Sequence, residues 1–442
     1  MPEVKKQTTV FEFGYLVNGD DKSGKVPASP QIKPISGEAY NYLRKLCLCD
    51  DSESRFMRLK QVDSCEVLQV KNYAGVIFTP DGTQIEVLPK VAKNSDDSAS
   101  RVSLLMMLKS LKQFRHLQTN NANLAENKIP LLEVFISQFL ASVNTLIKRG
   151  LKSDYVLKED NVAFLKGKLL VGKQVKHNFI NKHKFYVEYE EYLQDRPVNR
   201  LIHTALVKVK SYSRSANNQK LLQELLFAFA DIPLSNNVKN DFASVKLDRG
   251  MKYYEAPLAW AKLIIDGFSP LTLQGKSNAF SLLFPMEAVF ESFVAQYLKK
   301  HITGFGEVSA QVSTKSLVDY GNIPYFLLKP DLYISRKSDT DKSNDIVLDT
   351  KWKLINEKNS KRKDKFGLSQ ADFYQMLGYG HTYLNGEGDL VLIYPKTDVF
   401  SSAFPDSFNY DGGVLKLWVV PFDIQAKCEK RIDLSCLNIG LI

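Results

Sequence analysis

The C-terminal third of the chain constrains the fold most, because patterns typical of strands and helices alternate along it. Apolar spacing of three and four residues predicts helices over 285–300 and 369–384. Short runs rich in branched and aromatic residues predict strands, which cover 325–334, 345–354, 389–394 and 414–420. This order of elements predicts a small α/β core in which helices pack against a sheet.

The length and composition indicate a globular protein of several domains. At roughly 150 residues per domain, 442 residues predict two to four domains. A hydrophobic fraction of 44% is enough for packed cores, which excludes global disorder. Lys and Arg number 59 against 49 Asp and Glu, and the net charge of +10 weakly indicates a polyanionic partner such as nucleic acid.

The first 270 residues mix strand and helix patterns. A β-hairpin is predicted over 73–88, because two apolar runs flank a Thr-Pro-Asp-Gly turn. Strands are predicted around Phe164 and Leu169. Helical spacing predicts three helices, over 130–150, 199–213 and 219–229.

Three regions are therefore expected, a β-rich region over 1–125, a mixed and mainly helical region over 126–270, and the α/β region over 275–442.

The five cysteines are scattered and odd in number, which suits a reducing compartment. The N-terminus lacks the apolar segment of a signal peptide, and no run of about eighteen residues is apolar and uncharged. We expect a cytoplasmic protein without a membrane segment.

Charged residues in the predicted strands indicate a metal site. Asp331 follows a proline within the first strand, and Asp349 and Lys351 stand two positions apart on the next, so their side chains share one face. The preceding residues of that strand are apolar, and a buried charge without a partner is costly. Mg²⁺ prefers carboxylate oxygens and keeps several waters, so two acids are enough to hold it. A neighbouring lysine can orient a water and stabilise charge on a phosphate. The alternative to a metal site is that this loose pattern occurs by chance and that the charged residues lie on solvated strand ends.

Neighbouring helices supply further candidates. Glu291 lies beside the apolar face of the 285–300 helix and can reach the metal directly or through water, whereas Glu287 fits a solvated helix face. Gln375 and Tyr379 are one turn apart on the 369–384 helix and can position a phosphate or the lysine of the site. A polar stripe on a packed helix explains this pair as well.

A basic loop follows the second acid. It includes Lys353, Lys361, Arg362 and Lys363, which are expected to grip backbone phosphates and to make DNA binding sensitive to salt. A solvated loop is the simpler reading of any single lysine. Residues 19–25 fit a phosphate-binding G-x4-GK pattern, but Val26 replaces the Ser or Thr that would hold Mg²⁺, so a nucleotide site is rejected.

Short motifs along most of the chain resemble the McrC family, the nuclease subunits of McrBC-type modification-dependent restriction systems. The motifs are Tyr73-Ala-Gly-Val-Ile77, Ile85-Glu-Val-Leu-Pro-Lys90, Arg149-Gly-Leu-Lys-Ser-Asp-Tyr155, Phe164-Leu-Lys-Gly-Lys168, Asp195-Arg-Pro-Val-Asn-Arg200, Leu283-Phe-Pro-Met-Glu-Ala-Val-Phe-Glu291, Lys329-Pro-Asp331, Asp349-Thr-Lys351 and Gln370-Ala-Asp-Phe-Tyr-Gln375.

The resemblance implies a restriction-endonuclease-like PD-(D/E)xK domain at the C-terminus that cuts double-stranded DNA with Mg²⁺, or Mn²⁺ as a substitute. It implies that Asp331, Asp349 and Glu291 bind metal, that Lys351 is the catalytic lysine, and that Gln375 with Tyr379 is the supporting QxxxY motif. It also implies that the mixed α+β N-terminal region docks on a hexameric AAA+ GTPase and stimulates it.

The substrate implied by the resemblance is DNA containing 5-methylcytosine. A sequence-specific restriction subunit of the same architecture remains open, as does a non-catalytic regulatory module of an AAA+ GTPase.

Overall fold

The computed structural model describes residues 7–20, 29–49, 56–63, 65–92, 97–111, 130–266, 281–302, 306–321, 323–336, 345–425 and 430–437. The chain divides into two compact units. Unit 1 combines Met1–Lys128 with Ser269–Ile442, and unit 2 is Ile129–Phe268. The expected first and third regions thus form one unit, and the expected middle region corresponds to the other.

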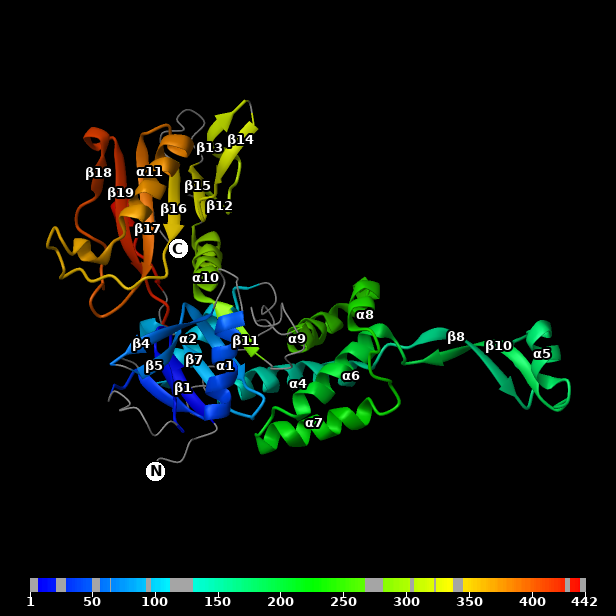
Figure 1. Ribbon diagram of the computed structural model, residues 1–442. Coiled ribbons are helices and arrows are strands. Elements are labelled where there is room, and N and C mark those ends of the chain that lie inside the picture. Colours follow the sequence, from blue (N-terminus) through cyan, green and yellow to red (C-terminus); the bar gives the residue numbers. More distant parts are fainter. Residues whose placement is uncertain are drawn as a thin grey trace. The chain divides into compact units, whose positions relative to one another are not determined.

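Two four-stranded sheets form the N-terminal part of unit 1 (Figure 1). The first has the order β1 (Gln7–Phe11), β7 (Gln84–Leu88), β6 (Tyr73–Phe78) and β11 (Ser281–Pro285). The second has the order β3 (Ile32–Ile35), β2 (Tyr15–Asn18), β5 (Cys65–Val70) and β4 (Met57–Val62). Both sheets and helix α1 (Gly37–Cys49) contribute to one apolar core. The predicted hairpin over 73–88 is confirmed as β6 and β7.

Gly75 allows the C-terminal strand β11 to join this N-terminal sheet. Its φ is +141°, and a Cβ at this position would lie 1.9 Å from the carbonyl oxygen of Leu282. A residue with a side chain would therefore push β11 away from β6. β11 ends at Pro285, and helix α10 (Met286–His301) follows directly. The N-terminal sheet is thus continuous in sequence with the first helix of the C-terminal core.

Helix α2 (Asp97–Leu108) follows β7 within the N-terminal segment of unit 1. The sequence predicts a polar linker over 93–100 and a helix over 101–114. The helix begins earlier, at Asp97, and ends at Leu108; residues 109–111 are not helical, and 112–114 lie outside the described residues.

A six-stranded mixed sheet forms the C-terminal core of unit 1. Its order is β12 (Gly306–Ala310), β15 (Leu332–Arg336), β16 (Ile346–Thr350), β17 (Gly388–Pro395), β19 (Leu415–Phe422) and β18 (Phe408–Tyr410). The central strands β16, β17 and β19 run parallel, and the remaining pairs are antiparallel. The predicted strands at 389–394 and 414–420 and both predicted helices are confirmed as β17, β19, α10 and α11 (Gln370–Leu384).

The strand predicted over 325–334 is wrong in one respect, because two separate strands occupy it. β14 (Ile323–Leu328) pairs with β13 (Lys315–Tyr320) in a separate hairpin, and β15 starts only at Leu332. Pro330 separates them, since proline lacks the N–H that a continuous ladder needs. Asp331 therefore precedes a strand and does not lie within one. The strand predicted over 345–354 is shorter, and β16 ends at Thr350.

Unit 2 contains a helical core. Its helices are α4 (Leu131–Arg149), α6 (Pro197–Lys210), α7 (Ala216–Ala228), α8 (Val238–Ser244) and α9 (Glu255–Asp266), which confirms the three predicted helices. Among the described residues, α4 alone is long and apolar enough to cross a membrane by length and composition, yet more than half of that window is buried. Phe135 of α4 packs on Trp260 of α9, as expected for an interior helix.

A buried acid joins α4 to α7. Glu133 is 6% exposed, and its carboxylate accepts hydrogen bonds from the backbone N–H groups of Arg214 and Ser215 and from the side chains of Ser213 and Asn218. These donors lie at the start of α7, where helical N–H groups lack partners within the helix. The contacts explain why an otherwise apolar helix carries a buried charge.

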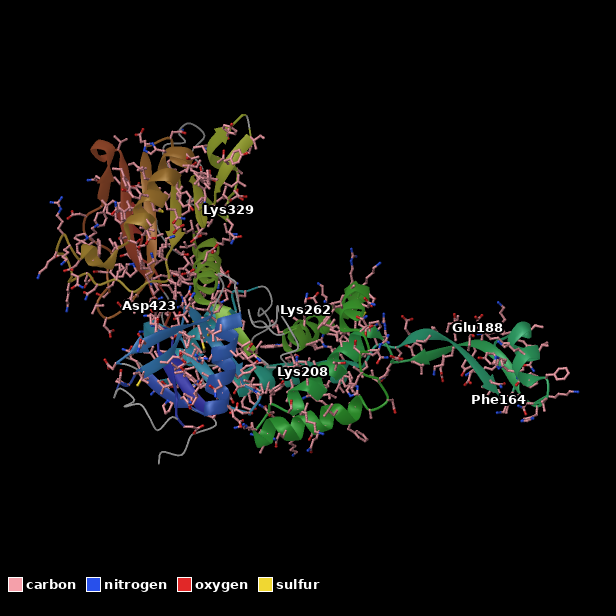
Figure 2. The ribbon with its side chains drawn as sticks, viewed as in Figure 1. Phe164, Glu188, Lys208, Lys262, Lys329 and Asp423 are labelled. Carbon is pink, nitrogen blue, oxygen red and sulfur yellow. The ribbon has the colours of Figure 1, made fainter. Side chains whose placement is uncertain are left out.

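A long two-stranded ribbon also belongs to unit 2 (Figure 1). β8 (Asp154–Val162) pairs with β10 (Phe185–Leu193), which also pairs with β9 (Lys168–Leu169), and helix α5 (Val171–Asn178) packs on β10. Phe164 and Glu188 lie in the part of the ribbon that carries α5 (Figure 2). Leu169 is in a strand as predicted, whereas Phe164 lies in a bend. We call residues 154–193 the arm.

Candidate active site

Asp349 and Lys351 stand at the end of a central strand of the C-terminal sheet. Asp349 is 1% exposed on β16, and its Oδ2 lies 2.5 Å from Nζ of Lys351. The N–H of Lys351 donates to the carbonyl oxygen of Ile393 at 2.9 Å, so the strand geometry continues one residue beyond β16. The predicted shared face of the two residues is therefore present.

Asp331 is held beside this pair by the residue between them. Its Oδ2 accepts hydrogen bonds from the backbone N–H of Thr350 at 2.7 Å and from the Thr350 hydroxyl at 2.6 Å. Its carbonyl oxygen accepts the N–H of Gln311. Although Asp331 lies outside the strand, these bonds fix it next to the Asp349–Lys351 segment.

The electrostatics of the pair follow from its burial. Desolvation, reinforced by the nearby charge of Asp331, raises the pKa of Asp349 to about 7, although Lys351 acts in the opposite direction. Desolvation lowers the pKa of Lys351, but the carboxylates of Asp349, Asp372 and Asp331 together more than offset it, so the net pKa of Lys351 is raised. The lysine is thus held in its charged form.

Glu291 approaches the same site from α10. It is half-buried, and its Oε1 accepts a hydrogen bond from Nε2 of Gln311 at 2.9 Å. Burial and the charge of Asp331 raise the pKa of Glu291. Glu287 is exposed, as expected of a solvated helix face.

The acids are suited to a cation that keeps part of its water shell. Oδ2 of Asp349 is buried and, apart from its ion pair with Lys351, no donor among the described residues is oriented to hydrogen-bond it. Within the same residues, no three His, Cys, Asp or Glu side chains already enclose a metal position. Mg²⁺ requires only one or two carboxylates besides water, so Asp331 and Asp349 fit this ion.

Gln375 and Tyr379 connect Lys351 to the segment before Asp331. Nζ of Lys351 donates to Oε1 of Gln375 at 2.9 Å, and Nε2 of Gln375 donates to the hydroxyl of Tyr379 at 2.7 Å. The Tyr379 hydroxyl donates to the carbonyl oxygen of Lys329 at 3.0 Å. Lys329 lies between β14 and β15 (Figure 2). This chain of hydrogen bonds limits the positions that the Lys351 ammonium can adopt.

The basic loop is more ordered than the sequence suggests. Lys353 is bound to the buried carboxylate of Asp372, at 3.0 and 2.8 Å, and not free to extend from the loop. Backbone hydrogen bonds from Asn356 to Phe366 and from Phe366 to Asn359 close the loop. The predicted DNA-binding residues Lys361, Arg362 and Lys363 are exposed on it.

Two features of the structure lie outside the site residues predicted from the sequence. Trp352, which follows the lysine of the site, is bound by Glu12 and Lys90 from the N-terminal part of unit 1. The arm exposes large apolar side chains, with Phe179 at 77% and Ile180 at 88%. The arm was signalled by short apolar runs between glycines, but no local pattern indicates the contact between residues 12 and 352.

The C-terminal core is a mixed β-sheet with helices, and it brings together two acids and a lysine. Their order in the sequence, Pro-Asp followed by Asp-x-Lys, matches the PD-(D/E)xK pattern. The model of the McrBC 5-methylcytosine restriction system component family matches residues 68–395. The chain belongs to this family.

One solved structure has the same fold, and a second is less similar. A chain in a half-complex of the tetradecameric assembly of Thermococcus gammatolerans McrB AAA+ hexamers with bound McrC is 20% identical and has a TM-score of 0.65, with 94% of each chain covered. A chain of the Thermococcus gammatolerans McrBC complex is 22% identical with a TM-score of 0.46, covering 68% of this chain and 89% of that one. No curated protein sequence matches the chain.

Proposed function

We propose that this chain is the DNA endonuclease subunit of an McrBC-type restriction system and hydrolyses DNA phosphodiesters with Mg²⁺ at Asp331, Asp349 and Lys351. The observation that carries the proposal is the buried Asp349 carboxylate paired with Lys351 at 2.5 Å, with Asp331 held alongside by Thr350. A purely structural role explains this poorly, because a buried ion pair contributes little to stability by itself.

Each residue has a defined role in the proposed reaction. Asp331 and Asp349 supply carboxylate oxygens to Mg²⁺ or Mn²⁺, and Glu291 contributes a third acid directly or through water. When bound, the ion supplies positive charge that activates a water and polarises the phosphate. Lys351, held charged by Asp349 and directed by Gln375, orients the attacking water and offsets negative charge that develops on the phosphate.

The basic loop supplies a surface for the DNA backbone. Exposed Lys361, Arg362 and Lys363 make salt-sensitive phosphate contacts. Lys353 joins them only where a phosphate displaces Asp372 from its ammonium, so its contribution is smaller than that of the exposed residues.

The partner is a hexameric AAA+ GTPase, and the arm is the surface that fits it best. The Thermococcus gammatolerans assembly consists of McrB AAA+ hexamers with bound McrC. The arm exposes a set of large apolar side chains that comprises Tyr155, Leu157, Phe164, Leu165, Val171, Val175, Phe179, Ile180 and Tyr192. A monomer rarely exposes so many on one extension, which marks an interaction site. We therefore propose the arm as the docking surface, in place of residues 1–125, which the sequence predicts to dock on the partner.

The test is cleavage of two plasmid DNAs in Mg²⁺, one with and one without 5-methylcytosine. Each is incubated with this protein in the presence and in the absence of the AAA+ GTPase partner and GTP. Cleavage that needs the partner and GTP and that is lost in Asp349→Ala and Lys351→Ala supports the proposal. Cleavage of methylated DNA alone supports 5-methylcytosine specificity, and equal cleavage of both supports a sequence-specific subunit. The reaction is expected in the cytoplasm.

A regulatory module is the second candidate, and the exposed arm is the observation that favours it. Stimulation of the partner GTPase without cleavage of either plasmid, in Mg²⁺ and in Mn²⁺, would establish it. Unchanged cleavage by Asp349→Ala would refute the assignment of the site.

A further inference from the structure

Trp352 lies between the proposed nuclease site and the N-terminal part of unit 1. It follows Lys351 directly in the chain and is 3% exposed. Its ring centroid lies 5.3 Å from that of Phe290, which directly precedes Glu291 on α10. Trp352 is therefore next to Lys351 in the chain, and its indole contacts the residue that precedes Glu291.

Two N-terminal residues bind the indole N–H and the backbone carbonyl group of Trp352. The indole N–H donates to the carboxylate of Glu12, at 3.0 Å to Oε1 and 3.1 Å to Oε2. Nζ of Lys90 donates to the carbonyl oxygen of Trp352 at 2.8 Å, and the Lys90 N–H donates to Oε2 of Glu12 at 2.9 Å. We call Glu12, Lys90 and Trp352 the clamp.

The clamp is built from residues that are costly to bury. Glu12 is 1% exposed at the end of β1, and Nζ of Lys90 also lies 4.7 Å from the ring centroid of Phe13. Burying the Glu12 carboxylate costs desolvation energy, and an apolar residue of similar size would avoid that cost. What Glu12 and Lys90 add is direction, because the carboxylate of Glu12 and the ammonium of Lys90 each bond a polar group of Trp352.

We propose that the clamp positions Lys351, so that the N-terminal β region completes the proposed nuclease site. The main chain of Lys351 is fixed on one side by Ile393. On the other side it is fixed through Trp352, by bonds to the side chain and to the carbonyl group of that residue. Glu12 and Lys90 are positioning residues, since they reach the reaction only through Trp352. This inference rests on the proposed function.

A second tryptophan–carboxylate pair offers a matched control. The indole N–H of Trp418 on β19 donates to Oδ1 of Asp389 on β17 at 2.8 Å. It lies in the same sheet as Asp349, and both of its residues are partly exposed. Asp389→Asn therefore alters the same kind of contact at a position that pairs with Ile346, five residues before Lys351.

The experiment compares Glu12→Ala, Glu12→Gln, Trp352→Phe and Asp389→Asn in the full chain. Cleavage kcat, the KM for DNA and stimulation of the partner GTPase are measured together with hydrogen exchange of peptides covering 345–356. We expect kcat to fall about 10- to 100-fold in Glu12→Ala, since small displacements of a reacting group cost about this much. Glu12→Gln keeps one acceptor and should lose less.

In Glu12→Ala and Trp352→Phe, the supporting result is a loss of kcat with unchanged KM and unchanged GTPase stimulation. Hydrogen exchange should become faster in these two variants only at residues 350–354. Asp389→Asn should show neither change. Wild-type kcat and exchange in Glu12→Ala would overturn the inference. So would faster exchange throughout unit 1 with loss of GTPase stimulation, because the clamp would then be merely structural.

Failure of the proposed function is distinguishable from failure of this inference. If the wild-type protein cleaves no DNA, exchange at 350–354 decides alone. Local acceleration in Glu12→Ala, absent in Asp389→Asn, would still link the N-terminal region to Lys351. Unchanged exchange would overturn that link.

Discussion

The titration of Glu12 should make unit 1 less stable as the pH rises through neutrality. Burial raises the pKa of Glu12 from 4.5 to about 7, although the Lys90 charge, the Lys90 N–H and the Trp352 indole all act in the opposite direction, and Glu287 adds to the rise. The folded state therefore binds a proton more tightly than the unfolded state does. The stabilisation is complete below pH 4.5 and is lost as the pH rises through about 7.

The magnitude follows from the two pKa values. Their difference of about 2.5, at roughly 1.4 kcal/mol per pKa unit, gives about 3.5 kcal/mol. Most of this change falls between pH 5 and pH 7. Glu12→Gln has nearly the same shape but does not titrate, so the difference between the two proteins isolates this one carboxyl group.

The assay is urea unfolding at pH 5, 6, 7 and 8, followed by tryptophan fluorescence in a Trp260→Phe background. The chain has three tryptophans, and this substitution leaves Trp352 and Trp418, both in unit 1, as reporters. Relative to Glu12→Gln, the protein with Glu12 should lose about 2 to 3 kcal/mol of unfolding free energy from pH 5 to pH 8. A difference that is constant with pH, or that changes in the opposite direction, would refute the reasoning.

Other substitutions test separate parts of the structure. Gln375→Ala should lower cleavage kcat about tenfold by freeing Lys351, with little change in the KM for DNA; an unchanged kcat contradicts the proposed role. Gly75→Ala should destabilise unit 1 by about 3 kcal/mol or more, measured by thermal melting against wild type, because its Cβ would meet the carbonyl of Leu282. Phe179→Ser combined with Ile180→Ser should weaken binding to the AAA+ partner at least about tenfold in a titration, without lowering the melting temperature; undiminished affinity would exclude this part of the arm. Chelation by EDTA should abolish cleavage, and Mg²⁺ or Mn²⁺ should restore it.

Apolar patterns in the sequence were sufficient to predict the helices and strands that pack in the cores. The helices α4, α10 and α11 and the strands β17 and β19 follow their predicted ranges closely, because each has a continuous apolar pattern. The break at Pro330 and the separate β13–β14 hairpin escaped prediction, since β14 is as apolar as a buried strand although it is largely exposed. Only its tertiary surroundings distinguish the two cases.

The sequence by itself determined the residue types of the candidate site and their spacing. Asp349 and Lys351 share a face because side chains alternate along a strand, whatever the rest of the chain does. Only the tertiary structure decided that Thr350 holds Asp331 and that Gln375 receives Lys351. It also decided that Glu12 reaches Trp352 across more than three hundred residues. Such contacts depend on how sheets and helices close around a core, and no local pattern in the sequence records that closure.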